Sequence, residues 1–331
     1  MNRRRRRLCL AAASLAATTT AWPQRATARL GYLSAREARS DIDDAFVRRM
    51  DELGYTVGRN LAIEYRFAGN DAARLKTMAE ELARMPVDVI VTATTAGTRA
   101  AMAATRTLPI VMAATADPVA TGLVASLARP GGNVTGLSLQ TPDVASKRLQ
   151  LTREIVPGAA RIALLAEKTA SPTQGTTASL VAESAAAAKT LGVTLIVREV
   201  HAAQALHEAF DAFRRENAQA LIVQVSPLLV EHRATIVALA SRNRLPAIYE
   251  ARNFVDAGGL ASYGPDLRAT YRRAADYVDR ILRGARPADL PVEQPERIAL
   301  VVNVSAAKAL GMTLPDAVML QAETVSRPVP R

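Results

Sequence analysis

Hydroxyl and carboxylate side chains follow the apolar, strand-like segments of this 331-residue chain at the points where those segments end. Thr94 and Thr95 stand between one such segment and a helical pattern. They can cap that helix or, together with its backbone N–H groups, hold an anion. In open parallel sheets ligands bind beyond the carboxyl ends of the strands, so these loops are the candidates for a binding site.

Three further polar residues of the first half occupy comparable positions. Thr115 lies at the tip of its apolar segment, and Ser34 occupies the matching position after the first segment. Asp117 is followed by Pro118, a pair that fits an N-cap and the first residue of a helix. We include Ser34, Thr115 and Asp117 among the predicted ligand contacts, with capping as the alternative for Asp117.

The second half offers an acidic and aromatic set at its own strand ends. Glu167 and Ser226 each follow an apolar segment, and Tyr249 and Glu250 follow a third. Glu250 is suited to pair with a ligand amine, Tyr249 to stack on the ligand and Tyr263 to close over it. The alternative for each is an ordinary surface or hinge residue. Hydroxyl donors on one side and carboxylates on the other predict an amino-acid-like or other small polar solute.

The residue types that usually carry catalysis are scarce. The histidines His201, His207 and His232 fall in or beside predicted helices, away from strand ends. The only cysteine, Cys9, lies near the N-terminus, and the chain has no nucleophile elbow, P-loop or G-x-G-x-x-G motif. We therefore predict a protein that is not an enzyme and that uses no cofactor and no metal.

These polar loops are positioned by a pattern that occurs twice. Three apolar runs recur in the same order at a nearly constant offset: Ala28–Ser34 with Ala160–Ala166, Val87–Thr94 with Ala218–Val225, and Leu108–Thr115 with Leu245–Arg252. In both halves such runs alternate with helical patterns, which is typical of parallel sheets covered on both faces. The sequence predicts an α/β protein with two similar Rossmann-like lobes joined by crossover hinge segments.

The expected elements divide between the lobes as follows. Residues 29–137 plus 258–290 form lobe 1, and residues 138–257 plus 291–331 form lobe 2. Within these ranges we expect a helix over Val119–Leu127, a strand at Gly258–Tyr263 and a helix over Leu267–Arg283, the last two returning to lobe 1. The Pro-rich stretch Leu290–Pro295 is hinge-like.

Residues 1–28 read as a secretory signal peptide. The five arginines of Arg3–Arg7 precede the apolar stretch Leu8–Ala17, and Ala26-Thr27-Ala28 offers a cleavage site of A-x-A form. The alternatives are a basic nucleic-acid-binding arm and a wrongly assigned start, and the arginines admit either general or twin-arginine export. Removing the six arginines of this segment lowers the formal net charge from +11 to +5. We therefore predict a periplasmic protein with no nucleic-acid partner and no membrane span.

Five stretches resemble a known family when taken together and in order: Leu53–Ala68, Ala116–Ser138, Phe254–Asp266, Ile281–Pro295 and Leu300–Pro315. Along nearly the whole chain after residue 28, the sequence is similar to type I periplasmic substrate-binding proteins of ABC transporters. Within these it resembles the uncharacterised tryptophan/tyrosine-type family.

The resemblance implies three crossover segments, a small-molecule solute clamped between the lobes by hinge closure, and delivery to a membrane ABC permease by a monomeric receptor. It favours Thr94 and Thr95 as ligand contacts. Relatives carry an Asn-Pro-like loop where this chain has Glu167-Lys168-Thr169, so ligand identity stays open.

Two other classes of function share this architecture. A periplasmic sensor would present its ligand to a signalling partner, and the sequence does not separate that role from transport. The sensory domain of a lactose-repressor-like regulator would need an N-terminal helix-turn-helix, and the signal-like segment occupies that place.

Overall fold

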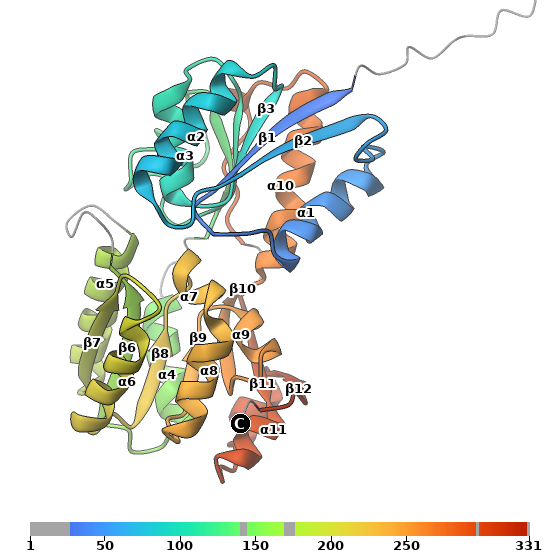
Figure 1. Cartoon of the computed structure of the whole chain (residues 1–331). Coiled ribbons are helices and arrows are strands. Elements are labelled where there is room, and N and C mark those ends of the chain that lie inside the picture. Colours follow the sequence, from blue (N-terminus) through green and yellow to red (C-terminus); the bar gives the residue numbers. More distant parts are fainter. Residues whose placement is uncertain (1–26, 140–143, 169–175, 296–297, 330–331) are drawn as a thin grey trace, which may run out of the picture.

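The computed structural model describes residues 27–139, 144–168, 176–295 and 298–329. The predicted signal peptide therefore lies almost entirely outside the described residues. In the part of the chain that is described, no helix is long and apolar enough to cross a membrane. Figure 1 shows two α/β lobes, one above the other, with the chain passing between them.

The first lobe is built on a five-stranded sheet in the order β2-β1-β3-β4-β5, with all pairs parallel. Its strands are β1 (Ala28–Ser34), β2 (Leu61–Phe67), β3 (Val89–Thr92), β4 (Ile110–Thr115) and β5 (Val134–Ser138). Its helices are α1 (Asp41–Glu52), α2 (Ala72–Arg84), α3 (Thr95–Ala104) and, from far along the chain, α10 (Leu267–Leu282). Because β3 and β4 are wholly buried, their runs are continuously apolar apart from a threonine at the end of each.

The second lobe is built on a seven-stranded sheet in the order β12-β11-β10-β9-β8-β6-β7. Its strands are β6 (Arg161–Glu167), β7 (Thr194–Val200), β8 (Ala220–Val223), β9 (Ala247–Tyr249), β10 (Ala261–Pro265), β11 (Ile298–Asn303) and β12 (Glu323–Val325). Its helices are α4 (Val144–Ile155), α5 (Thr176–Leu191), α6 (Ala205–Arg215), α7 (Pro227–Glu231), α8 (Arg233–Arg242), α9 (Arg252–Asp256), α11 (Val304–Ala309) and α12 (Asp316–Gln321). The pair β10–β11 is antiparallel and the other pairs are parallel.

The predicted fold class is confirmed, and two elements differ from expectation. The strand expected at Gly258–Tyr263 is β10, and it pairs with β9 and β11 in the second sheet, so of these two elements α10 alone returns to the first lobe. Residues Val119–Leu127 form turns rather than a helix. Gly122 has a positive φ of 69°, which breaks the helical path there.

The chain crosses between the lobes three times, and the last crossing is tied to the first lobe before it leaves. The backbone of Glu293 extends the edge of the first sheet, since its N–H donates to Gly136 O at 3.0 Å and its carbonyl accepts from Ser138 N at 2.8 Å. The helix α10 packs against α1 and shares ion pairs with it, among them Arg49 with Asp276 at 2.8 Å. These contacts fix the first-lobe side of the hinge.

Candidate ligand-binding cleft

A cavity of about 730 Å³ lies between the lobes. In each sheet there is one place where successive connections leave in opposite directions, between β1 and β3 in the first and between β6 and β8 in the second. Ligands of open α/β sheets bind in the crevice at such a switch point. The loops that follow these four strands all contribute to the cavity, so the two crevices face each other across it.

The first lobe presents the beginning of helix α3. Thr94 is the N-cap of this helix, and its hydroxyl oxygen accepts from Gly97 N at 3.0 Å. The hydroxyl of Thr95 accepts from Ala116 N at 3.4 Å, which joins the loops that follow β3 and β4. Both threonines line the cavity. The positive end of the helix dipole therefore faces the space where a ligand would lie.

Arg36, which the sequence reasoning did not select, also lines the cavity although it is only 5% exposed. Its Nε donates to Ser34 Oγ at 3.3 Å, and its terminal nitrogens donate to Ser40 Oγ and to the Asp43 carboxylate. Burial acts to lower the pKa of Arg36, but Tyr271 and Asp43 raise it above its ordinary value. A buried guanidinium that stays charged therefore stands at the first-lobe switch point.

The second lobe presents Glu167 and Ser226. Glu167 ends β6, and one of its carboxylate oxygens accepts from Leu228 N at 3.3 Å. Burial raises the pKa of Glu167 above its ordinary value, and hydrogen bonds from Ser226 and Leu228 oppose that rise. Ser226 is the N-cap of α7 and accepts from Leu229 N at 3.2 Å. Both residues line the cavity.

Three predicted contacts of the first lobe lie next to the cavity without lining it. Ser34 and Thr115 are fully buried; Ser34 Oγ accepts from Arg36, and the hydroxyl of Thr115 lies 3.4 Å from that of Thr98. Asp117 accepts from the backbone N–H groups that follow it, at 2.9 and 3.1 Å. Capping, the alternative that the sequence left open for Asp117, is what this geometry shows.

The three remaining predicted contacts serve the interior of the second lobe. Tyr249 is 1% exposed, stacks on Phe254 with ring centroids 4.8 Å apart and has its pKa raised by burial. Glu250 accepts from Arg148 at 2.6 Å through one oxygen and from Val225 N at 2.7 Å through the other. Tyr263 lies in β10, and its carbonyl oxygen accepts from Arg148 Nε at 3.2 Å. The structure thus brings four of the ten predicted residues together in the cleft: Thr94, Thr95, Glu167 and Ser226.

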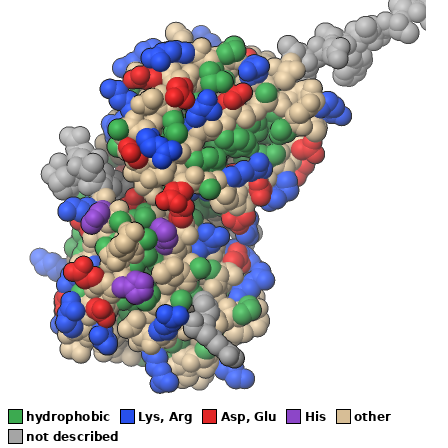
Figure 2. Space-filling model, viewed as in Figure 1, with side chains coloured by type: hydrophobic (Ala, Val, Ile, Leu, Met, Phe, Trp, Pro, Cys, Tyr) green, Lys and Arg blue, Asp and Glu red, His purple; other side chains and the backbone are tan. Residues whose placement is uncertain are grey.

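The expectation that the histidines lie away from strand ends is wrong for His201, which directly follows β7 and lines the cleft. In Figure 2 the histidine side chains lie apart from one another on the face of the second lobe. Among the residues that the structure describes, no group of three or more His, Cys, Asp or Glu side chains is placed to hold an ion.

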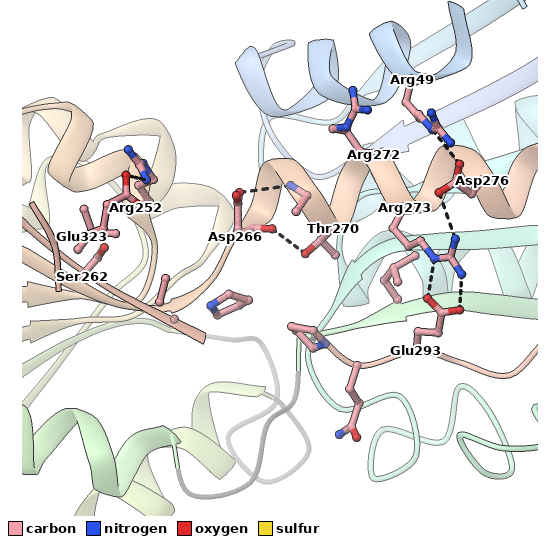
Figure 3. A pocket seen from close by; sticks show the side chains of 18 residues that line it. Arg49, Arg252, Ser262, Asp266, Thr270, Arg272, Arg273, Asp276, Glu293 and Glu323 are labelled. Atoms are coloured by element: carbon pink, nitrogen blue, oxygen red, sulfur yellow. Dashed lines mark hydrogen bonds and ion pairs between the residues drawn. The ribbon is translucent and has the colours of Figure 1, made fainter. Parts of the chain in front are cut away.

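A second cavity of about 630 Å³ lies on the hinge side of α10 (Figure 3). Leu267 and Tyr271 of this helix line the cleft, whereas Ala269 and Arg273 line the second cavity, so the helix separates the two spaces. Arg273 makes two hydrogen bonds of 2.7 Å to the Glu293 carboxylate. This ion pair ties α10 to the crossover that leads to β11.

Comparison with known proteins identifies the family to which this chain is similar. A family model described as ABC transporter substrate binding protein matches residues 34–326. A tyrosine-binding protein from Clostridioides difficile is 27% identical over 270 residues, which are 81% of this chain and 75% of that protein. A Streptococcus pneumoniae domain solved in complex with L-Trp is 26% identical, with a TM-score of 0.80, and the match covers 91% of this chain and 100% of that one.

A third relative was solved without a ligand. The ligand-free, open structure of a substrate-binding protein with adhesive properties from Clostridium difficile is 25% identical, with the same coverage of 91% and 100%, but its TM-score is only 0.63. Identity and coverage are nearly equal to those of the L-Trp complex. The backbone of this chain therefore superimposes better on the L-Trp complex than on the ligand-free, open structure.

Proposed function

The chain belongs to the ABC transporter substrate-binding protein family, and from this premise we propose that it is an exported, monomeric receptor that captures an amino acid between its lobes and delivers it to an ABC permease. The observation that carries the proposal is the cleft itself, in which the switch points of two duplicated sheets face one another. Ligand contacts made by both lobes would favour the closed arrangement over the open one.

The lining of the cleft favours an amino acid with an apolar side chain. Beside the polar loops, the first lobe contributes small apolar residues, Ala93, Ala96, Ala114 and Ala116, and α10 contributes Leu267 and Tyr271. Small side chains leave room for a large ligand group, and an apolar wall favours an apolar one. The names of two relatives, one tyrosine-binding and one solved with L-Trp, support an aromatic amino acid.

The proposal includes export and the absence of catalysis. The signal-like residues 1–28 support a periplasmic location. In the cleft, Thr94 and Ser226 cap helices, and backbone groups donate to the Glu167 carboxylate. This arrangement is suited to reversible binding. We propose that no nucleic acid, cofactor or metal takes part.

A thermal-shift screen of the purified protein tests the proposed function, with the twenty amino acids, nucleobases, sugars and dicarboxylates as ligands. A ligand present at 100 times its dissociation constant adds about 2.7 kcal/mol to the free energy of unfolding. We expect tryptophan or tyrosine to give the largest rise in Tm. A rise confined to sugars, nucleobases or dicarboxylates would contradict an amino-acid receptor.

A further inference from the structure

The two sides of the cleft carry side chains of opposite charge, one buried and one partly buried. Arg36 follows the last residue of β1 by two positions, and Glu167 is the last residue of β6, the corresponding strand of the second lobe. Of the other charged or titratable side chains of the lining, Asp71, Lys168 and His201 are exposed to solvent, and Tyr271 is a buried phenol. The lining of the cleft therefore carries a guanidinium, itself paired with Asp43, on the first lobe and a carboxylate on the second.

Arg36 is held in place and keeps further donor capacity. A guanidinium has five N–H donors. Three are used in the described contacts, with Ser34, Ser40 and Asp43. Tyr32 donates to the same Asp43 carboxylate, which fixes the partner that orients Arg36. The N-terminus of α3 lines the same part of the cleft, and a helix N-terminus favours negative charge. Together these groups suit a carboxylate.

Glu167 offers the opposite chemistry. Its carboxylate lies at the second-lobe switch point, where backbone and hydroxyl groups donate to it. A partly buried carboxylate is stabilised by a cation that pairs with it at hydrogen-bond distance. An ammonium group on a ligand would supply that cation.

We propose that the cleft binds a zwitterion in one orientation, with its carboxylate on Arg36 and the N-terminus of α3 in the first lobe and its ammonium group on Glu167 in the second. This inference rests on the proposed function and gives the ligand a direction. A ligand that lacks either charge forgoes the hydrogen bonds of one of these two sites, although Arg36 keeps Asp43 and Glu167 keeps its backbone and hydroxyl donors. Closure therefore selects for ligands that carry both charges.

The test measures the dissociation constants of three probes: L-tryptophan, tryptamine, which lacks the carboxylate, and indole-3-propionate, which lacks the ammonium group. Hydrogen bonds to charged groups contribute about 1.5–3 kcal/mol each, so the wild type should prefer tryptophan over either analogue by roughly 10- to 100-fold. Two variants each remove one of the charged side chains that would pair with the ligand. Arg36→Met combined with Asp43→Asn avoids leaving a buried carboxylate unpaired, and Glu167→Gln preserves shape.

The first lobe supplies a control of the same residue types at the C-terminal end of α10, where the arginine is half-exposed. There, Tyr55 donates to Asp279 at 3.0 Å and Arg283 donates to it at 2.7 Å, the same three residue types as around Asp43. Neither Asp279 nor Arg283 lines the cleft. The variant Arg283→Met with Asp279→Asn should keep both preferences of the wild type.

The expected result is a crossed pattern. The Arg36 variant should lose its preference over tryptamine but keep its preference over indole-3-propionate, and Glu167→Gln should do the reverse. If the wild type binds tryptophan and both variants keep both preferences, the inference is wrong while the proposed function stands. If the wild type binds none of the twenty amino acids, the proposed function fails and this inference fails with it.

Discussion

Each lobe contains a buried arginine–carboxylate pair beside the cleft, and the two pairs have different positions. In the first lobe Arg36 pairs with Asp43 and lines the cleft. In the second lobe Arg148 pairs with Glu250 at 2.6 Å, and neither residue lines the cleft. The comparison teaches that burial and ion pairing alone do not bring an arginine to the lining of the cleft; the position relative to the switch point does.

The Arg148–Glu250 pair holds the strand ends of the second lobe in register. Through Glu250 it reaches Val225, next to Ser226, and through Tyr263 O it reaches β10. Arg148 itself comes from α4, the first helix after the chain crosses into the second lobe. We infer that this pair positions the loops of the cleft while the Arg36 pair contacts the ligand.

We expect the largest loss of stability when the ion pair of the second lobe is broken. Arg148→Met leaves the 7% exposed Glu250 without its cation. Removing one partner of a buried ion pair typically costs about 3–5 kcal/mol, and we expect a loss of that size in chemical denaturation. Adding Glu250→Gln should restore most of the stability, because no unpaired charge is then buried. A loss below about 1 kcal/mol in the single variant would argue against a structural role.

The next largest effect is expected at the N-caps of α3 and α7. Thr94 and Ser226 have nearly the same backbone angles, φ −152° and ψ 160° against φ −149° and ψ 161°, and each caps its helix. Thr94→Ala and Ser226→Ala should each lower the free energy of unfolding by about 1 kcal/mol. Denaturation curves measured side by side check this. A much smaller loss at Ser226 would show that the five-residue helix α7 depends on its neighbours rather than on its cap.

Features of the cleft that depend on local sequence patterns could be predicted from the sequence. Thr94 and Ser226 were found because a hydroxyl residue after a buried strand and before a helical pattern is a local signal. Arg36 was not predicted because Ser34, the last residue of β1, was the only candidate considered there, although the loop beyond it enters the same crevice. Extending the search by two residues would have included it.

Long-range pairing could not be predicted from the sequence. Glu250 was expected to meet a ligand amine, but its partner is an arginine 102 residues away, and no local pattern links the two. The strand Gly258–Tyr263 was recognised as a strand, but alternation does not say which sheet a strand joins. Both differences arise from contacts between segments that are distant in the sequence.

The smallest expected effect is on the pH dependence of stability, which should differ between Glu167 in the cleft and Glu293 in the hinge. Burial raises the pKa of Glu167, whereas hydrogen bonds from Arg273 lower the pKa of Glu293, and the ordinary value for both is 4.5. A group whose pKa is raised on folding stabilises the fold below its unfolded pKa, and that contribution is lost as the pH rises through the folded value. A group whose pKa is lowered stabilises the fold above its unfolded pKa, and that contribution is lost as the pH falls.

Tm measured between about pH 3 and pH 7 should therefore change in opposite directions in the two variants. Glu167→Gln should raise stability relative to the wild type above the raised pKa, where the wild type buries a charge. Glu293→Gln should lower it there, by about 1 kcal/mol or less because this ion pair is about one third exposed. Saturating tryptophan should abolish the Glu167 effect, because an ammonium group beside that carboxylate would lower its pKa. A Glu167→Gln curve parallel to the wild type at every pH would mean that this carboxylate has the same pKa in the folded and unfolded states, and burial would then not distinguish Glu167 from an exposed carboxylate.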